Sequence, residues 1–133
     1  MSGHGGYKLF GVYVSQPVRD ALADHFYETA GVIEFDEYFD PTVSTVPTGD
    51  PGADATDEFI SSVVTEFATL YDTADFDAAK AVDTDSFVLT HLAADPTTIA
   101  SARERFQAAA TIQETDTRTV HTAILDARLS ETA

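Results

Sequence analysis

Cysteine is absent from the 133 residues of the chain. Its absence excludes disulfide bonds, thiolate nucleophiles, iron–sulfur clusters and every cysteine-ligated zinc site. Long apolar runs are also absent, since the longest span only a few residues and a bilayer requires roughly 20. Residues 1–6 are polar and rich in glycine, which does not match a secretory signal. We therefore expect a cytoplasmic protein, or a component of a virion, without membrane insertion.

Basic side chains are scarce. Seven Lys and Arg against 23 Asp and Glu give a net charge of −16, and lysine occurs only as Lys8 and Lys80. Low lysine with abundant alanine and threonine is typical of proteins from molar salt, where a Debye length of about 3 Å screens surface carboxylates from one another. The alternative is an acidic mimic of nucleic acid that binds a basic partner. We favour adaptation to high salt, and direct binding of nucleic acid is not expected because no basic cluster exists.

The charge is unevenly distributed. Residues 34–95 hold fifteen acids and one base, whereas residues 1–33 and 96–133 carry a net charge of −1 each. A surface that serves only solvation is acidic throughout, so the near-neutral ends are expected to pack on each other or to contact a protein. These ends contain all five arginines, which either neutralise neighbouring acids or line an interface; our candidate interface residues are Arg103, Arg105 and Arg128.

An apolar content of 44% in a chain of this length is sufficient for a single core. We expect a flexible leader over residues 1–6 and one globular domain over residues 7–133. Alternating apolar residues predict strands over 8–15 and 32–39, and the segment from Pro17 to Gly31 between them has helical spacing. This order predicts a right-handed β-α-β unit.

The rest of the chain has helical patterns. A loop over residues 47–53 is expected to join the β-rich part to this helical part, after a possible short strand over 42–46. Residues 85–94 suit either a strand or a buried helix. Helices are predicted from Asp54 to Tyr71, over 75–82, from Pro96 to Ile112, and after a cap at Asp116. The predicted fold class is α+β, a helix-rich single domain with a small N-terminal β-α-β sheet followed by a helical remainder.

Motifs for common chemistries are missing. The chain has no phosphate-binding loop, dinucleotide-binding glycine motif, nucleophile elbow or H-E-x-x-H metal motif. The D-x-D pairs at residues 75–77 and 83–85 lack the remaining ligands of a calcium loop. No catalytic residue and no cofactor is predicted, and we lean against an enzyme.

Histidines are the remaining candidates for metal binding. If Met1 is removed, the start Ser2-Gly3-His4 places an amine, two amides and an imidazole where they can surround Cu²⁺ or Ni²⁺. His25 and Glu28 are three residues apart on the predicted first helix and share a face.

A convergent site can be built from histidines and acids. Two or three of His25, His91 and His121 can converge with Glu34 or Asp36 into a metal or acid–base site. The acidic cluster of residues 34–40, which comprises Glu34, Asp36, Glu37 and Asp40, is a separate candidate for general acid catalysis. The alternative is that each histidine is a half-buried side chain that is hydrogen-bonded to the backbone or to a carboxylate and binds no metal. The acids are otherwise the solvated side of a strand.

These features favour a non-catalytic interaction or assembly subunit, adapted to high salt, of a larger cellular or viral particle. Its partner is expected to be another protein or a second copy of the chain. The alternative is a small enzyme or a ligand- or metal-binding domain that uses His25, Glu28 and the acids of residues 34–40. Convergent polar groups in a pocket favour this alternative, whereas an apolar patch flanked by arginines favours assembly.

Overall fold

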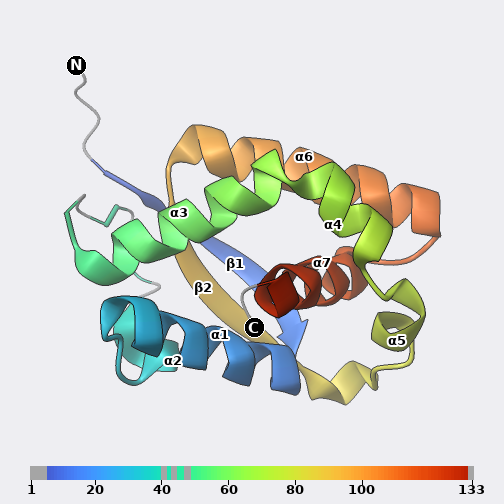
Figure 1. The fold of residues 1–133 in the computed structure, drawn as a ribbon, viewed down its shortest axis with the longest axis horizontal. Helices are drawn as coiled ribbons and strands as arrows, with labels where there is room; N and C mark the ends of the chain where they lie inside the picture. Colours follow the sequence, from blue (N-terminus) through green and yellow to red (C-terminus); the bar gives the residue numbers. More distant parts are fainter. Residues whose placement is uncertain (1–5, 40–41, 43–44, 47–48, 132–133) are drawn as a thin grey trace.

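The structure is a computed structural model that describes residues 6–39, 42, 45–46 and 49–131. Helices lie in front of a two-stranded sheet and along both of its sides (Figure 1), so the α+β, helix-rich class predicted from the sequence is confirmed. The elements in chain order are β1 (Lys8–Ser15), α1 (Gln16–Ala30), α2 (Phe35–Tyr38), α3 (Pro51–Thr65), α4 (Phe67–Thr73), α5 (Phe76–Lys80), the 3₁₀ turn η1 (Thr84–Ser86), β2 (Phe87–Ala94), α6 (Pro96–Gln113) and α7 (Thr117–Glu131).

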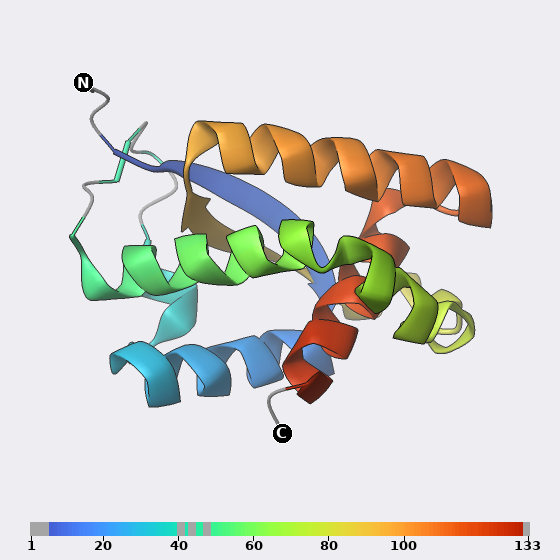
Figure 2. The same ribbon diagram turned by 45° about the horizontal axis from the view of Figure 1, so that its top comes forward.

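The sheet is antiparallel and joins segments far apart in sequence. Its register runs from Lys8 opposite Ala94 to Ser15 opposite Phe87. Alternate residues of β1, namely Phe10, Val12 and Val14, are almost fully buried. Helices α3 and α7 lie in front of the strands in Figures 1 and 2 and pack on β2 and β1 respectively. One face of the sheet therefore belongs to the core.

Capping residues explain where the helices begin and end. Pro17 lies in the first turn of α1, where its missing N–H has no helical partner to lose. Gly31 ends α1 with a φ of 71°, a left-handed conformation that costs glycine little. The carboxylates of Asp50, Asp75 and Asp95 accept hydrogen bonds from backbone N–H groups in the first turns of α3, α5 and α6.

The strand predicted over residues 32–39 is wrong, and with it the parallel β-α-β pairing. Residues 35–38 form the short helix α2 instead. Phe35 and Phe39 are four residues apart, a spacing that suits a helical turn as well as a strand, and both are buried. The ring of Phe35 stacks on Phe26 of α1 at 5.3 Å between centroids. The sheet partner of β1 is β2, the segment for which the sequence left strand and helix open.

The helix predicted from Asp54 to Tyr71 begins earlier and is interrupted. Asp50, rather than Asp54, is its N-cap, and Pro51 opens the first turn of α3. Asp54 instead accepts a hydrogen bond from the hydroxyl of Tyr7 at 2.6 Å. The helical segment breaks at Glu66 and continues as α4. The loop predicted over residues 47–53 is therefore too long, because residues 51–53 belong to α3; residues 47–48 lie outside the described part of the chain.

Two other predictions fall partly outside the described residues. The leader over residues 1–6 is described only at Gly6. Of the possible strand over 42–46, the structure shows one antiparallel bridge between Val46 and Tyr7. Within the described ranges, no helix combines the length and the apolar character needed to cross a bilayer.

The core lies between the sheet and the helices. Its largest fully buried side chains come from the strands and from helices α1, α3, α4, α6 and α7: Phe26, Phe106, Leu22, Ile60, Leu70, Leu92, Ile124, Leu125, Val12, Val14, Val63 and Val120. The apolar stripe predicted for residues 54–71 contributes Ile60, Val63 and Leu70, which are all 0% exposed.

Candidate functional site

The second face of the sheet is partly open to solvent. In an antiparallel pair, directly opposed residues share a face, and here Tyr13 opposes Leu89 and Gly11 opposes His91. Tyr13 is 50% exposed and Leu89 is 47% exposed. The side chain of Leu89 leans across Gly11, where an added Cβ would lie 3.2 Å from the Leu89 Cδ1. We call these four residues the open strand face.

The strands that carry this face contain no carboxylate. Neither the eight residues of β1 nor the eight of β2 include Asp or Glu, although the chain has 23 acids. Asp95 follows β2 directly, and Asp85 lies two residues before its first residue. An exposed apolar pair on strands without carboxylates is therefore a candidate contact surface in a chain whose charge otherwise favours contact with water.

Packed side chains border the open strand face. At one end, Phe39 and Val46 cover Ala93, and Leu9 packs against the same cluster. Beside the face, Phe35 and Phe39 line a small recess with Leu89 and His91.

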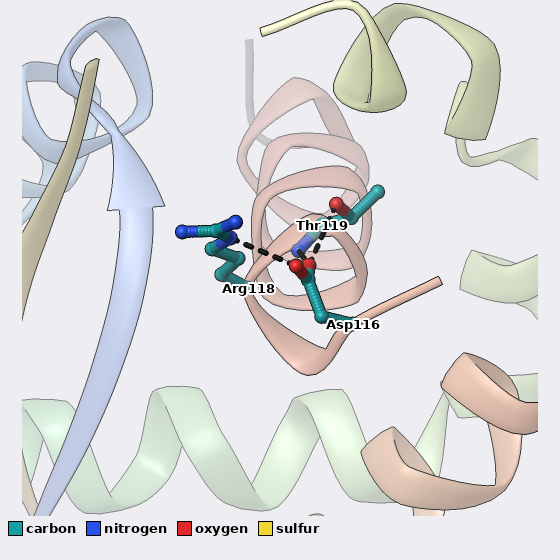
Figure 3. A network of polar contacts seen from close by, with 3 residues as sticks. All are labelled: Asp116, Arg118 and Thr119. Atoms are coloured by element: carbon teal, nitrogen blue, oxygen red, sulfur yellow. Dashed lines mark hydrogen bonds and ion pairs between the residues drawn. The ribbon is translucent and has the colours of Figure 1, made fainter. Parts of the chain in front are cut away.

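At the other end, the guanidinium of Arg118 lies 5.1 Å from the centroid of the Phe87 ring. Figure 3 shows how the first turn of α7 fixes this arginine: Arg118 Nε donates to Asp116 Oδ2 at 2.9 Å. The N–H and the hydroxyl of Thr119 donate to Asp116 Oδ1, which confirms the predicted cap. Burial alone would raise the pKa of Asp116, but the hydrogen bonds from Thr119 and the charge of Arg118 outweigh it and lower the pKa.

Residues of α1, α3 and α7 line a polar cleft of about 390 Å³. These three helices pack against one another, as their ribbons in Figure 2 indicate. The antiparallel pair α1 and α3 supplies most of its lining, because residues three, four and seven apart on a helix share a face. The lining residues are His25, Thr29, Ala55, Glu58, Phe59, Ser62 and Arg128.

Arg128 is held in this cleft by contacts with α3. Its Nε donates to the Ser62 hydroxyl at 2.8 Å, and its guanidinium carbon lies 5.5 Å from the Phe59 ring centroid. Ser62 in turn donates to the carbonyl of Phe59 at 2.7 Å. The His25 ring lies 5.4 Å from the same phenyl ring. Burial lowers the pKa of His25, the positive charge of Arg128 lowers it further, and Glu28 opposes the shift.

The structure separates most of the residues predicted to form a metal or acid–base site. His25 lines the cleft, but Glu28 is exposed and does not line it. Glu34 immediately precedes α2 and Glu37 lies within it; both are exposed, and neither lines the cleft. His4, Asp40 and the side chain of Asp36 lie outside the described part of the molecule.

The other histidines lie apart from His25. His91 is on the open strand face, and His121 is buried on α7 against Phe10 and Phe106. Among the described residues, no group of three or more histidines and acids is arranged to hold a metal ion.

The three candidate interface arginines line three separate depressions. Arg103 lines a depression with Lys8 and Leu9, and its guanidinium lies 5.4 Å from the Phe10 ring centroid. Arg105 lies two residues further on α6, on another side of the helix, beside an apolar groove formed by α4 and α6. The third arginine, Arg128, is the one in the polar cleft.

Sequence reasoning missed three features of these surfaces. Glu58 and Ser62 of the cleft gave no signal, because their positions depend on how α3 packs against α1 and α7. The carboxylate-free strand β2 did give one: residues 86–94 form an uncharged run inside the acidic segment 34–95. The net charge of residues 34–95 hides this uncharged run, because acids lie on both sides of it.

Comparisons with known proteins add no relative to this description. No family model matches the chain, and neither a curated protein nor a solved structure matches it.

Proposed function

We propose that the chain is a non-catalytic assembly subunit, adapted to high salt, that associates with a second copy of itself through the open strand face. The observation that carries this proposal is the exposed pair Tyr13 and Leu89 on strands that contain no carboxylate. Exposed contiguous apolar surface of this kind is characteristic of contact sites between proteins.

Charge favours a second copy as the occupant. Each copy carries a net charge of −16, so most pairs of faces would bring carboxylates together. A two-fold contact places the same patch on both copies. Because β1 and β2 contain no carboxylate, two copies can bring these strands together without placing like charges at the centre of the contact.

The contact must extend beyond the four residues of this face. An interface of standard size buries about 800 Å² on each partner. Phe35 borders the face, and Ile33, two residues before it in the sequence, is 70% exposed and is a candidate for further apolar contact. Arg103 lies at the edge of β1 beside Lys8 and Leu9, with its guanidinium over Phe10 of the buried face, so it can reach carboxylates of the partner only at the rim of the contact.

Sedimentation equilibrium in about 2 M KCl tests the proposal, because repulsion between copies is screened there. The wild-type chain should form a dimer, and Leu89→Asp should be monomeric, since it places a carboxylate in the contact. The matched control is Ile112→Asp on α6, where the parent side chain is 68% exposed and lies outside the face. This variant should remain dimeric.

Two results would overturn the proposal. One is a wild-type chain that stays monomeric at every concentration. The other is a dimer that persists in Leu89→Asp and dissociates in Ile112→Asp. Thermal melts of both variants show whether each chain is folded when its mass is measured.

A further inference from the structure

The cleft between α1, α3 and α7 contains two opposite charges that do not pair with each other. Arg128 and Glu58 both line it. The ion pairs within the described chain join Arg19 to Asp20 and Arg118 to Asp116, and neither Arg128 nor Glu58 takes part in one. Arg103 and Arg105 also lack a carboxylate partner in the described residues, so what distinguishes Arg128 is its place in one cleft with a carboxylate and the contacts that hold its side chain there.

Contacts within the protein hold the Arg128 side chain but leave its terminal nitrogens available. The Nε donates to Ser62, and the guanidinium lies over Phe59, which is 3% exposed. No hydrogen bond within the described residues uses the two terminal amino groups. These groups form a planar fork that matches the two oxygens of a carboxylate. Arg128 is thus pre-oriented for one anionic group.

The other polar groups of the cleft limit what this anion can be. Burial and the charge of Arg128 both lower the pKa of His25, which favours its neutral form. A neutral imidazole offers one donor and one acceptor. With His25 neutral, the charges of Arg128 and Glu58 cancel, so a doubly charged anion such as phosphate would gain from one and be repelled by the other. A ligand with one positive and one negative group satisfies both.

We propose that this cleft binds a small zwitterion that carries one carboxylate and one ammonium group, the chemistry of a free α-amino acid. The carboxylate accepts hydrogen bonds from the Arg128 fork, and the ammonium group faces the carboxylate of Glu58. His25 and Thr29 of α1 supply further polar contacts from the opposite wall. A volume of about 390 Å³ falls within the usual range for small-molecule sites. This binding does not depend on the assembly proposed above.

The test is an NMR titration of the ¹⁵N-labelled chain with L-alanine and L-glutamine. Acetate, methylammonium and inorganic phosphate serve as ligands that carry only one of the two charges. Both amino acids should give saturable shifts of the backbone amides around Glu58 and His25, and each single-charge ligand should bind about tenfold more weakly or worse.

Variants separate the two charges of the cleft. Glu58→Gln and Arg128→Gln should each weaken binding of the amino acids by about tenfold or more. Arg128→Gln also removes the contacts of Arg128 with Ser62 and Phe59, so a thermal melt must show that this variant is folded. Glu58 is exposed, so Glu58→Gln tests the proposal in a chain whose fold is unchanged. Asp126→Asn is the matched control, because Asp126 is exposed on α7 and does not line the cleft. It should bind as the parent chain does.

Two outcomes would overturn the proposal. If acetate or phosphate binds as tightly as the amino acids, and binding of these anions improves in Glu58→Gln, the cleft is a simple anion site. If no probe gives a saturable shift, the cleft binds no ligand of this chemistry.

Discussion

The imidazole of His121 stands edge-on to the ring of Phe106, with the centroids 4.6 Å apart and the planes at 85°. The side chain is 8% exposed, and its Nδ1 has no hydrogen-bond partner among the described residues. Burial lowers the pKa of His121 to about 4, although the backbone of Tyr13 and the charge of Asp116 favour the protonated form. His121 is therefore neutral in the folded chain at pH 7.

This histidine should make stability fall in acid. Its folded-state pKa of about 4 lies below the value of 6.5 expected for the unfolded chain, so the unfolded chain takes up the proton first as the pH drops. The full contribution of neutral His121 is present above about pH 6.5, and by about pH 4 the free energy of unfolding should lose up to about 3 kcal/mol from this residue.

Urea unfolding of the wild-type chain and of His121→Leu, at constant salt from about pH 7 to about pH 4, measures this loss. The variant should lose less stability over that range. Some dependence on pH will remain in both chains, because the pKa of His25 is lowered as well. Parallel curves for the two chains would show that His121 does not contribute.

Buried and exposed isoleucines should differ sharply in their effect on stability. Ile60 of α3 is 0% exposed, so Ile60→Ala should lower the free energy of unfolding by about 2–5 kcal/mol through lost burial and a residual cavity. Ile112 is 68% exposed, and Ile112→Ala should change the free energy of unfolding by no more than about 0.5 kcal/mol. Denaturant titrations compare the two. A loss below about 1 kcal/mol for Ile60→Ala would contradict the position of α3 in the core.

Stability should rise with salt. Residues 34–95 carry fifteen acids and one base, and their repulsion is screened only when the Debye length falls to a few ångströms. Thermal melts from about 0.1 M to about 2 M KCl should therefore show a steep increase in Tm. A flat Tm would contradict adaptation to high salt and favour the acidic mimic of nucleic acid.

The two neighbouring arginines of α6 should behave differently when reversed in charge. Arg103→Glu removes a cation–π contact with Phe10 and places a carboxylate beside β1, so it should lower Tm and weaken association. Among the residues that the structure describes, Arg105 makes only a 3.5 Å hydrogen bond, to the Ser101 carbonyl of its own helix, so Arg105→Glu should change association little. Sedimentation in about 2 M KCl, combined with melts, distinguishes them. An Arg105→Glu variant that dissociates while Arg103→Glu does not would place the contact on the α4–α6 groove.

Much of the fold follows from local signals in the sequence. The strand over residues 8–15, the helix that ends at Gly31 and the cap at Asp116 depend on alternation, proline, glycine and aspartate at fixed offsets, and the structure confirms them. The prediction of a strand over residues 32–39 was wrong because the four-residue spacing of Phe35 and Phe39 fits both the alternation of a strand and one turn of a helix. Packing of Phe35 on Phe26 decides between them, and that contact is tertiary.

The candidate surfaces were less accessible to sequence reasoning. His25 and Arg128 are 103 positions apart and meet only because α7 returns to α1 and α3, so no spacing rule pairs them. Tyr13 and Leu89 oppose each other only in the final register of the sheet. The uneven charge did indicate that part of the surface avoids carboxylates, but locating that part required the pairing of β1 with β2.

The most direct test of the assembly account is an isotope-filtered NOE experiment on a mixture of labelled and unlabelled chains in about 2 M KCl. The filter retains only contacts between copies, which separates them from the contact of Leu89 with Gly11 in the same chain. The account predicts NOEs from the methyl groups of Leu89 to protons of the open strand face in the other copy. Intermolecular NOEs confined to Ile112, or none at concentrations where the chain is a dimer, would contradict it.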